Sequence, residues 1–166
     1  STKVAWMKRR ADLKTLFLRG DYRDLLDTVE ITQVAGLTDD DFTFFIGSLG
    51  FNGRKEEAET FFLKRKDQLT DRSIVACQFF IGIAFCRAGQ YKKARSYFAI
   101  NLSRARNTTN ELTQFYAFQG LGFYRYFCAR YEKARRAAEK SLGASTFAGF
   151  SYGRTLASDL YGHTLV

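Results

Sequence analysis

The single histidine of this chain is the clearest candidate for chemistry. His163 follows Asp159 by one helical turn, a spacing at which a carboxylate can orient an imidazole. No third residue supplies the remaining role of an acid–base or nucleophilic site, so a hydrogen bond on a helix surface accounts for the pair. Gly47, Gly50 and Gly53 do not form a phosphate loop, because no strand precedes them and no Gly-Lys-Ser follows. We therefore expect no catalytic residues and no enzymatic activity.

The cysteines do not indicate a metal site. Cys77, Cys86 and Cys128 lack the close pairing of metal ligands, and no histidine lies near them in sequence. On one helix, Cys77 and Cys86 would lie about 13 Å apart, which is too far for a disulfide. Reduced thiols packed in a core are the natural interpretation, and they are typical of a cytoplasmic protein. We expect no bound metal and no cofactor.

Composition favours one folded domain with a basic surface. The 166 residues are 46% hydrophobic and 16% aromatic, and there is no proline to interrupt a long helix. Lys and Arg outnumber Asp and Glu by 26 to 17, which gives a net charge of +9. Such a charge favours an acidic peptide, nucleic acid or an anionic surface as partner, although a solvated basic exterior has the same composition. No signal peptide and no apolar run of membrane-spanning length is visible, so we expect no membrane contact.

One six-residue phrase occurs four times and indicates how the chain folds. Its copies begin at Gly20, Gly53, Gly89 and Ala129, and their last residues are 33, 36 and 40 positions apart. That period is typical of helical-repeat arrays. The first residue closes one helix in a conformation that glycine adopts easily, and an aromatic residue starts the next helix in three of the copies. The small residue that ends most copies is expected where two helices cross closely.

Apolar periodicity and capping residues place the helices. Thr38, Thr70 and Thr108 each offer a hydroxyl cap with acidic residues in the first turn. The expected spans are 3–18, 21–34, 39–51, 54–68, 71–88, 91–105, 109–128, 131–142 and 147–166. The last span is expected to be the first helix of a fifth repeat. Because Ser1 is not an initiator Met and Val166 stops inside an apolar helical pattern, we expect an excised part of a longer protein.

The third copy lies in a segment that resembles the tetratricopeptide repeat (TPR). The match runs through Ile81-Gly82, Phe85, Gly89, Tyr91, Ala94 and Phe98. The next repeat matches through Leu121-Gly122, Tyr131, Ala134 and Leu142, and has Arg125 where the family prefers an aromatic. The resemblance covers nearly the whole chain, without the family's closing proline. It implies an all-α fold, a right-handed superhelical array of antiparallel helix pairs, with residues 1–166 as a single TPR-like domain of about four repeats plus the first helix of a fifth.

The resemblance also implies a partner-binding face, because the first helix of each repeat in that family lines a concave groove. Carried over to this sequence, the groove positions are Arg10, Lys14, Phe17, Phe79, Ile83, Arg87, Gln119, Phe123, Tyr126, Asp159 and His163. Aromatic side chains with a few basic groups suit a peptide or helix that brings apolar anchors and some acid. Core packing is the alternative for Phe79, Phe123 and Tyr126, since aromatic stripes at helical spacing often lie inside.

Three functions remain open on the sequence alone. We favour a scaffold or adaptor module that binds a peptide, a helix or a neighbouring domain in the concave groove. Nucleic-acid binding is less favoured, because basic residues such as Arg65, Lys92 and Arg136 are expected to face solvent on the second helices, apart from the aromatic stripe. The third is a regulatory or sensor array of a multidomain protein, for example a transcription regulator. Self-association is a related expectation, because a half repeat over 147–166 would leave an apolar face uncovered.

Overall fold

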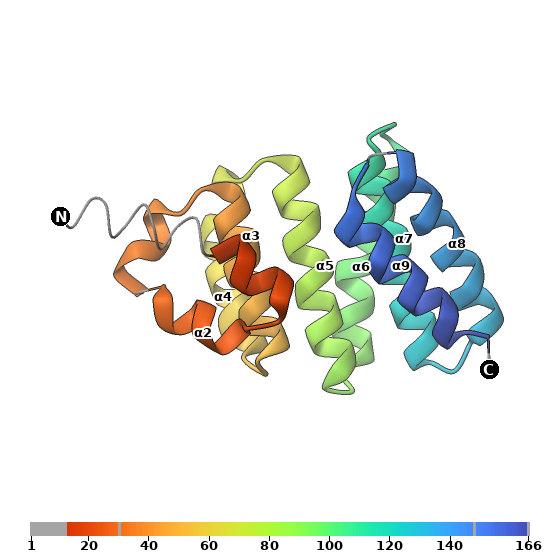
Figure 1. Ribbon diagram of the computed structural model, residues 1–166, viewed down its shortest axis with the longest axis horizontal. Helices are drawn as coiled ribbons and strands as arrows, with labels where there is room; N and C mark the ends of the chain where they lie inside the picture. Colours follow the sequence, from red (N-terminus) through yellow and green to blue (C-terminus); the bar gives the residue numbers. More distant parts are fainter. Residues whose placement is uncertain (1–12, 30, 148, 166) are drawn as a thin grey trace. The chain divides into compact units, whose positions relative to one another are not determined.

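The computed structural model describes residues 13–29, 31–147 and 149–165, and within these ranges the regular elements are helices and no strand occurs (Figure 1). Helical residues 13–19 come first. The elements that follow are α2 (Tyr22–Thr28), η1 (Ile31–Gly36), α3 (Asp39–Phe51), α4 (Lys55–Arg65), η2 (Lys66–Gln68), α5 (Asp71–Arg87), α6 (Tyr91–Arg106), α7 (Glu111–Phe127), α8 (Tyr131–Phe147) and α9 (Ser151–His163). The all-α prediction is therefore confirmed. None of the helices in the described ranges has the length and apolar character needed to cross a membrane.

Three of the predicted spans are wrong. The span 21–34 divides into the short α2 and the 3₁₀ helix η1, because the β-branched residues Thr28, Val29, Ile31 and Thr32 lower helix propensity there. The span 131–142 extends to Phe147, and α9 begins four residues later than predicted.

The repeated phrase forms the same helix-closing turn in every copy. The φ angles are 79°, 78° and 77° at Gly20, Gly53 and Gly89, in the left-handed region that glycine adopts at low cost. Each of these N–H groups donates to the carbonyl three residues back, and the next N–H donates to the carbonyl five residues back, as in a Schellman motif. Ala129 makes the same bonds at φ 57° without being glycine. Gly149, at φ 64°, closes α8 in the same way.

Side-chain caps define the starts of the first helices of the hairpins. Thr38 and Thr70 accept hydrogen bonds from the N–H groups three residues on, at 3.2 and 3.4 Å, as predicted. The prediction of Thr108 as a cap is wrong. Asn110 caps α7 instead, because its side-chain oxygen accepts the Thr113 N–H at 3.0 Å.

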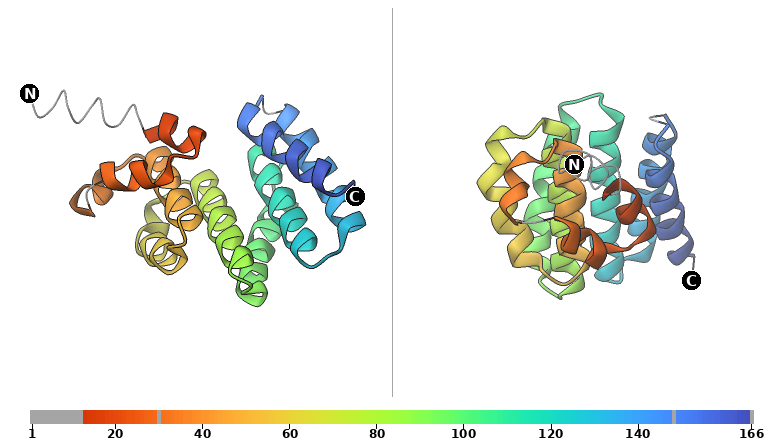
Figure 2. Two further views of the ribbon diagram at one scale, coloured as in Figure 1. Left: turned by 60° about the horizontal axis from the view of Figure 1, so that its bottom comes forward. Right: turned by 60° about the vertical axis from the view of Figure 1, so that its left-hand side comes forward.

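The chain divides into two compact units, residues 1–80 and 81–166, and α5 contributes to both. Within unit 1, α3 packs against α2 and α4. Within unit 2, α7 packs against α6, α8 and α9, and α8 packs against α9. Figure 2 shows the α3–α4 and α7–α8 pairs from two further sides, each as an antiparallel pair joined at one end. The predicted packing of neighbouring helices into antiparallel pairs is thus present in both units.

Glycine meets an aromatic ring at the helix contacts of both units. In unit 2, the Phe98 ring lies against Gly82 and Gly120, and a Cβ atom added at either glycine would come within 2.5 or 2.6 Å of the ring. In unit 1, a Cβ atom at Gly47 would come within 2.7 Å of the Phe17 ring. Real Cβ atoms essentially never come so close to another heavy atom. The rings can therefore pack at these positions only because glycine has no side chain.

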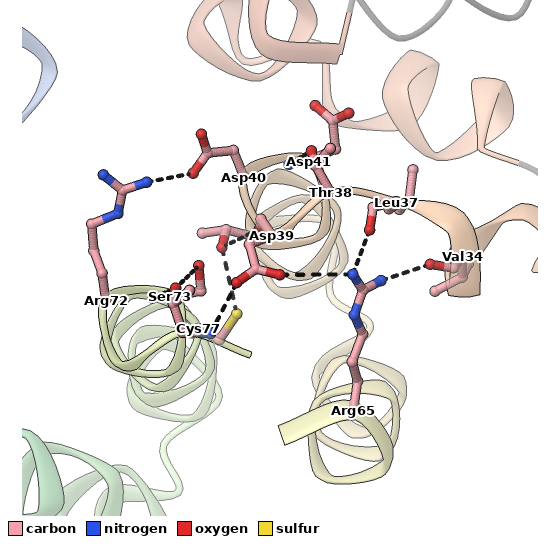
Figure 3. Close-up of polar contacts among 12 residues, drawn as sticks. Val34, Leu37, Thr38, Asp39, Asp40, Asp41, Arg65, Arg72, Ser73 and Cys77 are labelled. Carbon is pink, nitrogen blue, oxygen red and sulfur yellow. Dashed lines mark hydrogen bonds and ion pairs between the residues drawn. The ribbon is translucent and has the colours of Figure 1, made fainter. Parts of the chain in front are cut away.

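Arg65, at the end of α4, joins several parts of unit 1 (Figure 3). Its guanidinium donates to the carbonyl of Val34 at 2.9 Å and to that of Leu37. It also lies 3.9 Å from the Asp39 carboxylate and 4.6 Å from the centre of the Phe42 ring. Only 16% of the Arg65 side chain is exposed, so the expectation that it faces solvent is wrong. The guanidinium adds a second donor to the Val34 carbonyl, which also accepts the Leu37 N–H at 3.2 Å, and it supplies a donor to the Leu37 carbonyl.

Candidate partner-binding site

Four of the predicted groove residues lie in the core. The side chains of Phe17, Phe79, Ile83 and Gln119 are at most 2% exposed. Gln119 is held by two other helices: its amide donates to the Leu156 carbonyl at 3.1 Å, and its oxygen accepts the Ser141 hydroxyl at 2.8 Å. Side chains packed in this way offer no surface to a partner, so the assignment of these four to a binding face is corrected.

The predicted groove residues also include three basic residues, of which the structure describes two. Lys14, in the helical residues 13–19 of unit 1, and Arg87, at the end of α5 in unit 2, are both exposed. Arg10 lies outside the described residues. The structure therefore leaves Lys14 and Arg87 accessible, each within its own unit.

The remaining four predicted residues come together in unit 2. Phe123 and Tyr126 lie on the last turns of α7 and are half-buried, whereas Asp159 and His163 are exposed on α9. The Tyr126 ring lies 6.1 Å from the His163 ring, centre to centre. The His163 Nδ1 atom lies 2.7 Å from the Asp159 carbonyl oxygen and 3.7 Å from its carboxylate. This is the helix-surface contact that the sequence predicts for the pair.

Two further half-exposed rings extend this group, which we call the α7 aromatic cluster: Phe123, Tyr126, Phe127, Tyr131 and His163. Phe127 stacks on Phe123 at 6.3 Å and meets Tyr126 at 5.9 Å. Tyr131, the first residue of α8, lies 5.6 Å from Tyr126. The sequence indicated Tyr131 only as a residue that covers the helix junction, and Phe127 was missed because the family pattern places no groove residue there.

Small and polar core residues position this cluster. A Cβ atom at Gly122 would come within 2.8 Å of the Leu160 side chain, so the glycine allows α9 to approach α7 closely. Gln119, one turn earlier, binds both α8 and α9. One face of α7 is therefore covered by α8 and α9, while Phe123 and Phe127, on the adjoining face, remain half-exposed.

Two basic residues, Arg125 and Arg130, lie at the end of α7 and in the turn before α8, next in sequence to Tyr126 and Tyr131 of the cluster. The half-buried Arg125 donates to the Lys133 carbonyl at 3.1 Å, and Arg130 is exposed in the turn. Burial first, and then the positive charges of Arg130 and Arg136, lower the pKa of the Arg125 guanidinium. Like charges are thus crowded at this turn. The signal in the sequence was Arg125 itself, which stands where the family pattern prefers an aromatic.

The net charge of the protein belongs to unit 2. Residues 1–80 contain 13 Lys and Arg and 13 Asp and Glu, whereas residues 81–166 contain 13 Lys and Arg and 4 Asp and Glu. The net charge of +9 therefore falls in the unit that carries the aromatic cluster. A patch that combines exposed aromatic edges with uncompensated positive charge is suited to bind an apolar side chain next to an anionic group.

The thiols add no reactive group to this site. Burial raises the pKa of both Cys77 and Cys86 from 9.0 to about 12, so both remain protonated at neutral pH. Among the described residues, no three of His, Cys, Asp and Glu lie together as a metal site would require.

The predicted uncovered apolar face at the C-terminal segment is absent from the described part of α9. Its exposed residues are polar or glycine: Ser151, Arg154, Thr155, Ser158, Asp159, Gly162 and His163. Phe147 and Leu165 are exposed singly on either side of the helix, which is common on protein surfaces. The described residues of α9 therefore give no support to self-association through such a face, which stays a prediction.

Comparison of the chain with models of protein families, with curated proteins and with solved structures gave no match.

Proposed function

We propose that this chain is a TPR-like, right-handed helical-repeat module that binds another protein through the α7 aromatic cluster of unit 2. The observation that carries the proposal is the clustering of half-exposed rings at the end of α7, beside the exposed Asp159 and His163. Aromatic residues dominate binding energy at protein interfaces, where polar groups surround them. The repeated phrase supports the repeat architecture, because it closes helices by one turn geometry in both units.

Peptide display against the full chain tests this function. We expect the selected peptides to contain aromatic or large aliphatic anchors, and a selected peptide to bind Phe123→Ala about tenfold more weakly than the original protein. Ile100→Ala is the matched control, because Ile100 is 43% exposed on α6 of the same unit and lies outside the cluster. Circular dichroism melting curves verify that each variant folds. Equal affinity of the protein and of Phe123→Ala for every selected peptide would contradict the proposal.

Nucleic acid is the second candidate partner. The observation that favours it is that Arg95 and Arg130 act close to an aromatic residue, Tyr124. Burial raises the pKa of Tyr124, and the positive charges of the two arginines oppose that rise. Binding of a single-stranded oligonucleotide would then weaken steeply with salt, because phosphate contacts release counterions. Weak binding without salt dependence, measured by fluorescence anisotropy, would remove this candidate.

A further inference from the structure

We propose that the partner segment is an acidic peptide, whose carboxylates bind Arg125 and Arg130 at the α7–α8 turn while an aromatic side chain packs on the α7 aromatic cluster. This inference rests on the proposed function and adds the chemistry of the partner. It is argued from the charge balance of unit 2, from the geometry of the turn and from the packing of the rings.

The acidic residues of unit 2 leave these two arginines uncompensated. The carboxylates of this unit are Glu111, Glu132, Glu139 and Asp159. Glu132 accepts from Arg135 at 2.6 Å and lies 3.6 Å from Arg136, and Asp159 lies 3.7 Å from His163. In the described part of unit 2, no carboxylate pairs with Arg125 or Arg130. An anion from a partner would supply the missing charge.

The turn holds the two arginines at the same end of the hairpin. The Arg130 N–H donates to the Arg125 carbonyl at 2.8 Å, in the motif that Ala129 closes at φ 57°. One guanidinium N–H of Arg125 donates to the Lys133 carbonyl at 3.1 Å, which fixes the orientation of the group. A guanidinium has five N–H donors, so the fixed group still has donors for a carboxylate. A side chain ordered before binding loses less entropy when the ligand arrives.

Crowding of like charges favours an anion at this point. Burial and the charges of Arg130 and Arg136 lower the pKa of Arg125, which shows that its positive charge is partly desolvated and repelled. A bound carboxylate would reverse the sign of the local interaction. Because the group is half-buried, this attraction would be screened by salt less than that of a fully exposed pair.

Ring packing favours a peptide over single-stranded nucleic acid. Stacking of bases needs free ring faces. Around Tyr126 the neighbouring rings stand edge-on or tilted, at 84° for Phe127, 79° for His163 and 59° for Tyr131. This arrangement presents ring edges and the gaps between them, where a single aromatic or aliphatic side chain packs well.

Fluorescence anisotropy with three labelled probes tests the inference on the full chain. The probes are a peptide with one Phe between two runs of Glu, the same peptide with Gln in place of each Glu, and a single-stranded oligothymidine. We expect the Glu peptide to bind at least about tenfold more tightly than the Gln peptide. Arg125→Gln/Arg130→Gln should lose about tenfold in affinity for the Glu peptide. The matched control Arg106→Gln/Arg154→Gln removes the same charge from exposed positions of unit 2 and should lose less than about threefold.

The variants separate failure of the inference from failure of the proposed function. If Phe123→Ala weakens binding of the peptides but the arginine variant does not, the inference is overturned and the proposed function stands. If the arginine variant weakens binding but Phe123→Ala does not, the aromatic surface is wrong. Tighter binding of oligothymidine than of the Glu peptide, lost in the arginine variant, would overturn the acidic peptide in favour of nucleic acid. Arg130→Gln alone, at an exposed position, gives the same test should the double variant fold poorly.

Discussion

Units 1 and 2 share a turn and differ in charge. In the copies of the phrase that begin at Gly20 and Gly53, acidic and basic residues between the first and last positions offset each other, with a net charge of −1 and 0. In the copies that begin at Gly89 and Ala129, basic residues are in excess at the same positions, with a net charge of +2 and +1. The turn residues are the same in kind because they fix the backbone, whereas the intervening positions face outward and are free to vary. The backbone turn and the local charge therefore depend on different positions of one phrase.

Arginine shows the same contrast within the two units. Arg65 of unit 1 is largely buried and bonded to two carbonyls, and Arg72 lies 3.0 Å from the Asp40 carboxylate (Figure 3). Arg130 of unit 2 is exposed and pairs with no carboxylate in the described part of the chain. Arg65 of unit 1 is thus bonded within the fold, whereas Arg130 at the α7–α8 turn of unit 2 is exposed without a carboxylate beside it in the described residues.

The largest expected effect tests whether both units share one packing device. Gly120→Ala in unit 2 and Gly47→Ala in unit 1 should each reduce the free energy of unfolding by about 2–3 kcal/mol, because the new Cβ atom would overlap a buried ring. Urea unfolding followed by circular dichroism measures both. In unit 2, Phe98→Leu should restore part of the loss caused by Gly120→Ala.

Gly143→Ala is the control for that test. Gly143 is exposed within α8, and no atom lies within 4 Å of the position of its added Cβ atom. Alanine there should raise the free energy of unfolding by about 0.5–1 kcal/mol through helix propensity alone. If Gly143→Ala and Gly120→Ala reduced the free energy of unfolding by similar amounts, the ring contact would not be the cause of the loss in Gly120→Ala.

A smaller effect tests the contrast between the arginines. Arg65→Met should reduce the free energy of unfolding by about 2 kcal/mol, because the Leu37 carbonyl loses the donor that Arg65 supplies and the Val34 carbonyl keeps only the Leu37 N–H. Arg130→Met should change it by less than about 0.5 kcal/mol, because the side chain is exposed and loses only repulsion. Thermal unfolding of the two variants gives the comparison. Equal losses would remove the distinction between structural and available arginines.

Local features of this fold were predictable from the sequence, and those that depend on distant residues were not. The phrase located the turns at Gly20, Gly53 and Gly89 because their hydrogen bonds close within six residues. By contrast, the acceptors of Arg65 lie about thirty residues earlier in the chain, and no spacing rule connects them. The prediction of binding residues in α5 disagrees with the structure for another reason. This helix is apolar on all sides over residues 74–86, so periodicity could not separate a binding face containing Phe79 from the core.

The candidate site was predicted only in part, for a related reason. Phe123 and Tyr126 are half-buried at the end of α7, which is compatible with a binding face, and their role in binding stays a prediction. Gln119 was assigned to the groove because the offsets of the TPR pattern fall on it, yet its partners Ser141 and Leu156 come from helices that follow in the chain. Whether a polar side chain faces a partner or a neighbouring helix depends on contacts that a single sequence does not contain.

The smallest expected effect concerns the one turn of the phrase that lacks glycine. Ala129 has φ 57°, in the region where a Cβ atom costs about 1 kcal/mol, while Gly89 occupies the same turn of unit 2 at φ 77°. Ala129→Gly should therefore raise the free energy of unfolding by about 0.5–1 kcal/mol, and Gly89→Ala should lower it by about 1 kcal/mol. Urea unfolding resolves both changes. The same turn includes Arg130 and follows Arg125, so the affinity of Ala129→Gly for the Glu peptide should also be measured. Unchanged affinity would mean that the strain at Ala129 has no part in binding. Weaker affinity would mean that alanine, which is less mobile than glycine, holds the two arginines in place.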